Sequence, residues 1–245
     1  MLKNTESEND MEYDNSKFEM RDCFGICDLP SLLWQKADQG AFGRIVAGKP
    51  VDGPILDLAL DAPKWMELVS GRDVVVQAGG NQGMYPKYYA GLFKKVYTFE
   101  PDEDNYFCLD YNCQGTQYHK QKVGLGESNT TMNLVQLNVN NTGMHRTVSD
   151  EVIKANPNIP TSCVTKVEMI TLDSLNIEAC DLLQLDVELY ETEALVGAEE
   201  TIKKYSPIIV VETGNRPSPA DGYLNLLGYK MHSQLRMDAI YVKNN

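Results

Sequence analysis

The stretch that decides the fold is Val-Val-Val-Gln-Ala-Gly-Gly-Asn-Gln-Gly at positions 74–83. Positions 96–102 then read Val-Tyr-Thr-Phe-Glu-Pro-Asp. β-Branched residues favour a strand, and glycines let the backbone turn sharply and approach a ligand closely. A carboxylate at the end of the second strand can accept hydrogen bonds from both hydroxyls of a ribose. This order predicts a fold that binds a nucleoside-bearing cofactor.

Strands and helices alternate along the chain from residue 73 onward, except for an interruption at 130–172, where two expected strands flank a loop at 138–143. The expected strands cover residues 74–78, 96–100, 119–125, 130–137, 165–172, 181–187 and 207–212. The main helices are expected at 84–93, 102–111 and 190–205, and residues 229–242 should form two strands around a turn. Short apolar runs separated by helices predict an α/β fold with a doubly wound, mostly parallel sheet. The closing pair of strands should add an antiparallel edge.

The chain divides into two expected parts, residues 1–70 and 71–245. The first 20 residues carry six acids and two lysines, which is typical of a mobile acidic tail. A proline in the first turn predicts a helix that starts near Pro30, and a second helix is expected at 63–69. The first part is therefore interpreted as an acidic tail with a helical extension, and the second as the cofactor-binding domain.

Composition excludes some classes of protein. The 245 residues have a formal net charge of -13, which argues against an exposed nucleic-acid surface because phosphate binding needs Lys and Arg. No apolar run reaches the roughly 20 residues of a membrane helix, and the polar start is not a secretory signal. Six cysteines without such a signal indicate reduced thiols and a cytoplasmic location. Their spacing, C-x3-C and C-x4-C, is not that of a tight zinc knuckle, so no metal is expected.

Several polar residues stand where the expected strands end. In parallel sheets ligands bind beyond the carboxyl ends of the strands, and the residues at these ends are Gly79, Glu100, Val123 and Asp186. Glu188 lies two positions beyond Asp186, so both carboxylates should point to the same side. Two alternatives stay open: Glu100 favours the dipole of the following helix, or Glu188 caps the helix after it.

Taken together, these motifs resemble the FkbM-type methyltransferase family, whose members use S-adenosylmethionine. Residues 75–83 resemble the family's Val-x-Asp-x-Gly-Ala-Asn-x-Gly, and Phe-Glu-Pro at 99–101 matches its second motif. Further matches are Asn112, Thr-Leu-Asp-Ser-Leu at 171–175, the run at 182–188, Leu-x-Gly-Ala at 195–198 and Pro-x-Ile-x-x-Glu at 207–212. The resemblance covers residues 73–242. It implies a seven-stranded, Rossmann-like methyltransferase sheet.

Three positions depart from the family pattern. Gln77 stands where the family has an aspartate that faces the cofactor's ammonium group, so the charge is lost. Gln184 replaces a lysine, and Leu189 replaces the glycine after Asp-Val-Glu. These changes put cofactor affinity and the acceptor pocket in question.

The resemblance implies transfer of a methyl group to an acceptor oxygen, most simply O-methylation of a small molecule or glycan without a metal. Candidate catalytic bases are Asp186, Glu188 and His145. Candidate cofactor-binding residues are Gln77, Gly79, Gly80, Asn81, Gly83, Glu100, Pro101, Val123 and Asp186. Two alternatives remain: a methyltransferase-like binding module that has lost activity, indicated by Gln77, and a nicotinamide-dependent oxidoreductase.

Overall fold

The computed structural model describes residues 12–23, 29–40, 45–46, 49–50, 53–138, 140–214, 218 and 220–244. Of the expected acidic tail, residues 1–11 lie outside the described residues. The rest of that segment contains the start of a strand, β1 (Phe18–Arg21), so the expectation of a mobile tail is wrong there.

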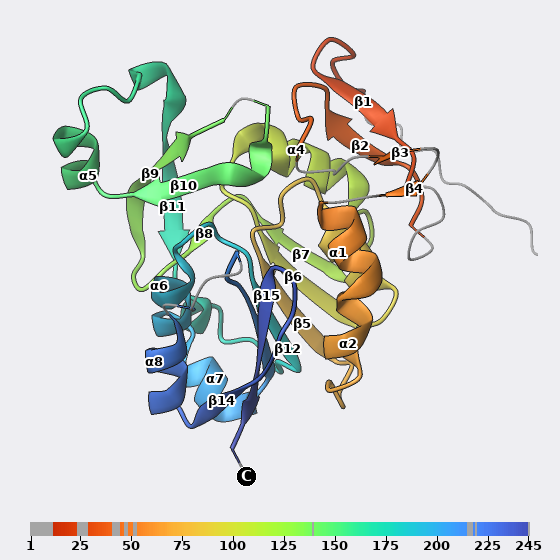
Figure 1. Cartoon of the computed structure of the whole chain (residues 1–245), viewed down its shortest axis with the longest axis vertical. Helices are drawn as coiled ribbons and strands as arrows, with labels where there is room; N and C mark the ends of the chain where they lie inside the picture. Colours follow the sequence, from red (N-terminus) through yellow and green to blue (C-terminus); the bar gives the residue numbers. More distant parts are fainter. Residues whose placement is uncertain are drawn as a thin grey trace, which may run out of the picture.

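A seven-stranded sheet forms the centre of the molecule (Figure 1). Its spatial order is β14 (Tyr229–Gln234), β15 (Asp238–Lys243), β13 (Ile208–Glu212), β12 (Leu182–Leu185), β5 (Val74–Ala78), β6 (Lys95–Phe99) and β7 (Tyr118–Gln121). The pairs β13–β12, β12–β5, β5–β6 and β6–β7 are parallel. β15 is antiparallel to both of its neighbours, so the sheet is mixed.

One expected strand is divided between two sheets. Residues 119–125 were expected to be continuous, but β7 ends at Gln121, and β8 (Gly124–Leu125) pairs in parallel with β11 (Val164–Ile170) of another sheet. Val123 lies between the two strands and packs against the core of the seven-stranded sheet. The chain therefore leaves the central sheet just before the position where a cofactor contact was expected.

Helices cover both faces of the sheet. Those between the parallel strands are α3 (Met84–Ala90), α4 (Glu103–Asn112), α6 (Glu191–Val196) and α7 (Glu199–Tyr205), and α8 (Ala220–Leu226) precedes β14. α1 (Pro54–Leu60) and α2 (Ala62–Met66) lie on the opposite side of the sheet from α6, α7 and α8 (Figure 1).

The single helix expected at 190–205 is two helices. A Cβ on Gly197 would lie 1.9 Å from the carbonyl oxygen of Gly126, so the chain packs there too closely for a side chain. The Asp173 carboxylate then accepts hydrogen bonds from the backbone amides of Glu200 (3.0 Å) and Thr201 (2.9 Å), which caps the second helix. This long-range cap starts α7 independently of α6.

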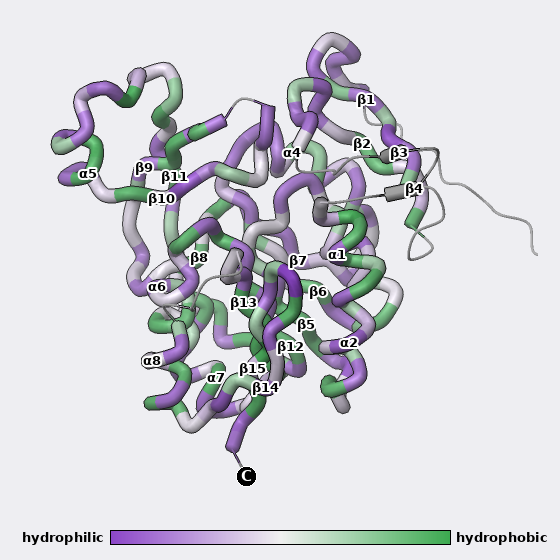
Figure 2. Tube along the Cα trace, in the orientation of Figure 1, coloured by the Kyte–Doolittle hydropathy of each residue, from purple (hydrophilic) through white to green (hydrophobic). Residues whose placement is uncertain are grey.

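The core lies on both faces of the central strands. Along β5, Val75 joins the cluster under α1 to α3, whereas Val74 and Val76 join the cluster under α6 to α8. Figure 2 shows these central strands in hydrophobic colours. Burying each such Val or Leu side chain contributes about 1.5–3 kcal/mol to stability.

Residues 124–170 form a second sheet of four strands beside the carboxyl ends of the central strands (Figure 1). Its order is β10 (His145–Val148), β9 (Thr130–Gln136), β11 and β8. A short 3-10 helix at Thr142–Met144 precedes β10, and α5 (Asp150–Ala155) follows it. Further 3-10 turns lie at Thr161–Cys163 and Leu172–Leu175. We call this unit the insert sheet.

The N-terminal part is the expected helical extension only in its last quarter, where α1 precedes α2 and α2 overlaps the helix expected at 63–69. Residues 32–35 form β2 (Leu32–Gln35), antiparallel to β1, instead of a helix. The side-chain amide of Asn112 accepts from Leu33 N (2.7 Å) and donates to Leu33 O (2.9 Å), which holds this segment extended. A second pair of strands, β3 (Ile45–Val46) and β4 (Lys49–Pro50), precedes α1 and α2. In the described part of the chain, no helix has the length and apolarity needed to cross a membrane.

Candidate active site

A cavity of about 660 Å³ lies beyond the carboxyl ends of β5, β6, β12 and β13, with β10 of the insert sheet along one wall. Its volume is within the range of small-molecule and cofactor sites. We call the part lined by Gly79, Asn81, Glu100 and Pro101 the glycine end. The part lined by Asp186, Glu188 and Glu212 is called the acidic end.

The glycine end is shaped by the backbone. Gly79 has φ +80°, and a Cβ there would lie 1.7 Å from the carbonyl oxygen of Asp186. Both Gly79 N (3.0 Å) and Gly80 N (2.9 Å) donate to Phe99 O, so the turn is tied to the end of β6. Only glycine permits this close approach of β5 to β12, because any side chain would collide with the neighbouring strand.

Glu100 is buried and already oriented. Its two carboxylate oxygens accept hydrogen bonds from Asn81 N (2.8 Å) and Asp102 N (2.9 Å). Burial, with the nearby charge of Asp102, raises the pKa of Glu100 to about 7. Each oxygen keeps a free lone pair, so the carboxylate can accept further hydrogen bonds from a ligand in the cavity.

Asn81 adds a second acceptor beside Glu100. Its side-chain Oδ1 is buried and has no hydrogen-bond partner in the described part of the chain. A buried acceptor without a partner costs about 1–3 kcal/mol. A ligand that donates a hydrogen bond to Asn81 at this point in the cavity would remove that cost.

The two glutamines that depart from the family pattern lie under the site, inside the core. Gln77 donates to Gly79 O (2.8 Å) and accepts from the Thr98 hydroxyl (2.9 Å), and it does not line the cavity. Gln184 accepts from the Tyr89 hydroxyl at 2.8 Å. Both amides are therefore bonded to the protein and help to hold the strand ends in register.

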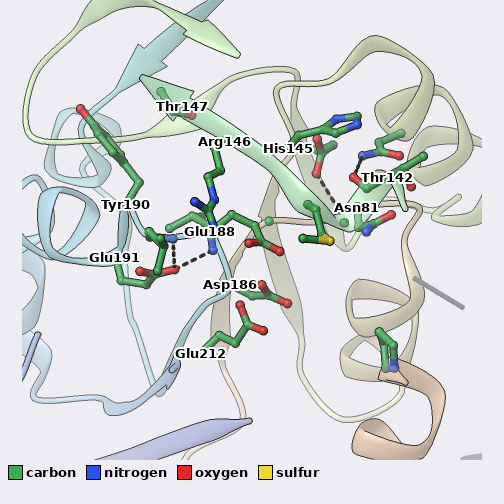
Figure 3. Close-up of a pocket in the computed structure, with 18 of the residues that line it drawn as sticks. Asn81, Thr142, His145, Arg146, Thr147, Asp186, Glu188, Tyr190, Glu191 and Glu212 are labelled. Atoms are coloured by element: carbon green, nitrogen blue, oxygen red, sulfur yellow. Dashed lines mark hydrogen bonds between the residues drawn. The ribbon is translucent and has the colours of Figure 1, made fainter. Parts of the chain in front are cut away.

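Three carboxylates meet at the acidic end. Ligand oxygens of Asp186, Glu188 and Glu212 lie within 4.8 Å of one another, and Figure 3 shows the three side chains converging. Burial, followed by the charge of Glu212, raises the pKa of Asp186 well above its usual value, and the pKa of Glu188 rises to about 7 for the same two reasons. Carboxyl groups this close share protons. They offer oxygen ligands of the type that hard cations take, and they can equally take a proton from a substrate.

The acidic end is held by a strained backbone. Glu188 (φ 54°) and Leu189 (φ 74°) are consecutive left-handed residues without being glycine. The carboxylate of Glu191 accepts from Val187 N (3.2 Å) and Leu189 N (3.1 Å), which fixes this turn (Figure 3). Leu189 occupies the position where the family has a glycine after Asp-Val-Glu. The positive φ at this position explains the family's choice, because glycine adopts such a conformation without strain.

His145 and Arg146 enter the cavity from β10. His145 has a side chain that is only 6% exposed, and its Nδ1 lies 3.3 Å from Asp102 Oδ2. Burial lowers the pKa of His145, but contact with Asp102 and the charges of Glu100 and Asp38 raise it more, so the net shift is upward. Arg146 extends toward the turn that carries Glu188 (Figure 3), and its buried Nε has no partner among the described residues.

The structure brings most of the expected site residues to one cavity. Those that line it are Gly79, Asn81, Glu100, Pro101, His145, Asp186 and Glu188. Gln77, Gly80, Gly83 and Val123 do not line it. Gly80 packs against α4, where a Cβ would lie 2.3 Å from the Leu109 side chain, and Gly83 begins α3 with φ +94°. These two glycines therefore shape the turn and make no direct contact with the cavity.

Other lining residues were missed. Glu212 ends the Pro-x-Ile-x-x-Glu pattern, which was read as a family match and not as a site. Arg146 and Thr142 belong to the insert, and Asp57 lies on α1 of the N-terminal part. The sequence gives little indication of a site role for Arg146, Thr142 and Asp57, because none of them lies near the end of a central strand in the sequence.

Comparison with known proteins supports this interpretation of the motifs. Residues 77–237 match the model of the methyltransferase FkbM domain. A solved FkbM methyltransferase from Methylobacillus flagellatus KT is 17% identical, with a TM-score of 0.44, and the match covers 70% of this chain and 43% of that one. The chain thus spans less than half of the length of that protein.

Two further solved structures are more distant in sequence. An rRNA methylase from Streptococcus thermophilus is 13% identical over 80% of this chain and 100% of that chain, with a TM-score of 0.43. A tRNA (uracil-54, C5)-methyltransferase from Pyrococcus abyssi, in complex with S-adenosyl-L-homocysteine, is 11% identical over 95% of this chain and 45% of that chain, with a TM-score of 0.45. No curated protein sequence matches this chain.

The family match covers well over half of the chain and includes the glycine turn, Glu100, the insert and the acidic end. The order of these features along the chain is the order of the family motifs identified in the sequence. On this basis the chain belongs to the FkbM methyltransferase family.

Proposed function

We propose that this protein is an S-adenosylmethionine-dependent O-methyltransferase that acts on a small molecule or glycan. The observation that carries the proposal is the cavity with two chemically different ends, the glycine end and the acidic end. One end is suited to a nucleoside, and the other to proton transfer at an acceptor hydroxyl. Family membership favours methyl transfer over the nicotinamide chemistry that the sequence left open.

The glycine end fits the adenosyl part of the cofactor. The carboxylate of Glu100 and the unpartnered Oδ1 of Asn81 are adjacent acceptors, and the two hydroxyls of a ribose are donors. Gly79 lines the cavity, so the backbone of the turn is available to lie against the ligand. Bound at this end, S-adenosylmethionine would supply a methyl group on a positively charged sulfur.

The acidic end fits the acceptor. In the transfer, a carboxylate takes the proton of the acceptor hydroxyl while the new O–CH₃ bond forms and the S–CH₃ bond breaks. We assign this role to Glu188, because its pKa of about 7 is close to that of an efficient general base at neutral pH. Burial and the charge of Glu212 raise the pKa of Asp186, which favours the protonated carboxyl as a hydrogen-bond donor to the acceptor.

His145 has a different role in this proposal. Its ring contacts Asp102 at the start of α4, and the charge of Glu100 is one of the influences on its pKa. That position places His145 beside the glycine end, where it would orient Glu100 and the cofactor. This assignment replaces the general-base role that the sequence left open for it.

Two features bear on the class of acceptor. The net charge of -13 and the carboxylates of the acidic end disfavour an RNA acceptor, although two of the solved relatives are RNA methylases. A neutral hydroxylated molecule avoids repulsion from this end. The cytoplasmic location expected from the sequence stays a prediction.

The alternative of a binding module that has lost activity depends on Gln77. That side chain is bonded within the protein to Gly79 and Thr98, so its missing charge is not in the cavity. This geometry favours an intact site in which the glutamine has a structural role.

The deciding experiment is calorimetric titration of the purified protein with S-adenosylmethionine and S-adenosylhomocysteine, followed by a methylation screen against hydroxylated small molecules and oligosaccharides. We expect one binding site per chain and methylated product from at least one acceptor. Absence of binding by both compounds would refute the proposal, and binding without product from a broad screen would favour the binding module.

A further inference from the structure

The segment 32–40 lies outside the family-matched region, which begins at residue 77, yet it is bonded to the loop that leads into β10. This loop, residues 140–145, carries Thr142 and His145, and five of its residues line the cavity beside the glycine end: Asn141, Thr142, Gly143, Met144 and His145. The side-chain contact between the segment and the loop joins two buried residues, Asp38 and Thr142.

Asp38 is the centre of these contacts. The residue is fully buried, and its Oδ2 accepts from Trp34 Nε1 (2.8 Å), Gln82 Nε2 (2.9 Å) and the Thr142 hydroxyl (3.1 Å). Its Oδ1 accepts from Gly40 N at 3.2 Å. One carboxylate therefore joins the N-terminal segment, the glycine turn and the loop before β10.

A second line of contacts runs parallel to the first. Gln35 Nε2 donates to Asn105 Oδ1 (2.7 Å), and Asn105 Nδ2 donates to Thr142 O (3.2 Å). Gln39 N donates to Asn140 O at 2.9 Å. The loop is thus held through the Thr142 hydroxyl, the Thr142 carbonyl and the Asn140 carbonyl.

The side chains that hold the loop lie outside the cavity. Gly40, at the end of the segment, lines the cavity, but Asp38 and Gln35 do not, whereas the loop that they hold does. The other fixed point of this loop is His145, whose Nδ1 lies 3.3 Å from Asp102 at the N-terminus of α4. Buried polar networks in which each member has a partner specify one arrangement of the groups that they join.

We propose that the N-terminal segment 32–40 is a structural part of the cofactor site, in which Asp38 is a positioning residue that holds Thr142 and, through the loop 140–145, His145 against the glycine end. The proposal rests on the proposed function, since it concerns the same cavity. It gives a role to a region for which the family motifs supply none.

The test compares binding of S-adenosylhomocysteine by the full chain with that of the variants Asp38→Asn, Thr142→Val and Thr142→Ser. We expect Asp38→Asn and Thr142→Val each to weaken binding about fivefold to tenfold, since tenfold corresponds to roughly 1.4 kcal/mol, about the net strength of one hydrogen bond. Thr142→Ser keeps the hydroxyl and should bind as the wild type does. The double variant Asp38→Asn/Thr142→Val should lose less affinity than the product of the two single losses, because both substitutions remove the same contact.

Two controls separate positioning from general destabilisation. Ile202→Val removes a methyl group from a fully buried residue of α7, far from the loop, and should lower the unfolding temperature without changing affinity. Amide exchange in residues 141–147 should be faster in Asp38→Asn than in wild type, and unchanged in Ile202→Val.

The outcomes distinguish the two proposals. If the wild-type chain does not bind S-adenosylhomocysteine, the proposed function fails. If the wild type binds and folded Thr142→Val binds equally well, or if Thr142→Ser is as weak as Thr142→Val, the role given to Asp38 is wrong.

Discussion

The two ends of the cavity are built in different ways. At the glycine end, the residues with positive φ are Gly79, where a Cβ is sterically excluded, and Asn81 (φ 46°), a residue type that enters the left-handed region more readily than most. At the acidic end, the positive-φ residues are Glu188 and Leu189, which keep their side chains and are held by Glu191. The glycine end is therefore shaped by residue types that adopt positive φ at little cost, and the acidic end by Glu188 and Leu189, for which positive φ is strained.

This difference fits the two tasks. A cofactor is recognised by close backbone approach and a few fixed acceptors, whereas an acceptor needs carboxylates aimed at one point. Non-glycine residues with a strained backbone are enriched at functional sites, where the surrounding structure holds them in place. The glycine end should thus tolerate almost no change of its backbone, and the acidic end should lose activity before it loses stability.

The largest effect is expected from Gly79→Ala. The new Cβ would lie 1.7 Å from Asp186 O at φ +80°, so we expect a loss of about 3 kcal/mol or more in the free energy of unfolding. The matched control is Gly222→Ala in α8, where a Cβ meets nothing within 4 Å; it should stabilise the helix by about 0.5–1 kcal/mol. Denaturant unfolding measures both, and equal stabilities for the two variants would contradict the close approach of β5 to β12.

Glu188→Gln tests the acidic end. Removal of the general base should lower kcat by about 100-fold to 10,000-fold, with affinity for S-adenosylhomocysteine unchanged within about threefold. Glu200→Gln, at a side chain that is 77% exposed, should leave kcat unchanged. Steady-state kinetics with the acceptor found in the screen provides the measurement. If the Glu188→Gln variant had a normal kcat, Glu188 would not be the general base, and another carboxyl group of the acidic end would have to fill that role.

Glu100→Gln tests the glycine end. The substitution removes a charged acceptor and places an NH₂ group opposite a backbone amide, so affinity for S-adenosylhomocysteine should fall about 10-fold to 100-fold. Glu103→Gln, at a side chain that is 75% exposed one turn away, should bind normally. Calorimetry distinguishes the two, and equal affinities would show that Glu100 does not contact the ligand.

The pH dependence separates ligand binding from stability. Glu100 and Glu188 each have a pKa of about 7 in the folded protein, above the usual 4.5. Between these values the folded state binds more protons than the unfolded state, so their contribution to stability is full below pH 4.5 and is lost as pH rises to 7. Affinity for S-adenosylhomocysteine should change in the opposite direction and rise through pH 7 as Glu100 ionises.

Thermal unfolding and calorimetry across pH 5 to 8 check both trends. In Glu100→Gln the rise in affinity through pH 7 should disappear, and in Glu188→Gln it should remain. A pH-independent affinity in the wild type would argue that the ligand does not bind the ionised carboxylate of Glu100.

Leu189→Gly should have the smallest effect. Relief of the left-handed conformation at φ 74° is only partly offset by the greater chain entropy of glycine in the unfolded state, so we expect a net gain of about 0.5–1 kcal/mol in the free energy of unfolding and a rise in unfolding temperature of about 1–4 °C. The Leu189 side chain is 50% exposed, so little buried area is lost. A loss of stability would mean that contacts of this side chain outweigh the strain.

The local sequence pattern was sufficient to predict those elements and site residues that depend only on neighbours along the chain. The run at 74–78 is β5 as expected, and Glu100 lies at the end of β6 because a β-branched strand, a turn and a helix follow one another without long-range help. The helix after it starts one residue from the expected start, since Asp102 caps it through the backbone amides of Asp104 and Asn105.

Elsewhere, distant contacts overrode the local signal. Residues 32–35 were expected to be helical. The side-chain amide of Asn112 instead makes hydrogen bonds to both Leu33 N and Leu33 O, as the backbone of a neighbouring strand would. The expected helix at 190–205 is divided because Asp173 caps its second half.

What the sequence by itself determined is the family, the order of the central elements and the two acidic motifs, because each depends on residues that are neighbours along the chain. Only the tertiary structure decided that Glu212 joins Asp186 and Glu188, that Gln77 bonds inside the core, and that Asp38 reaches Thr142. These relations join groups that are up to 104 positions apart. Such distances are set by how strands pair and sheets pack, and no local pattern encodes them.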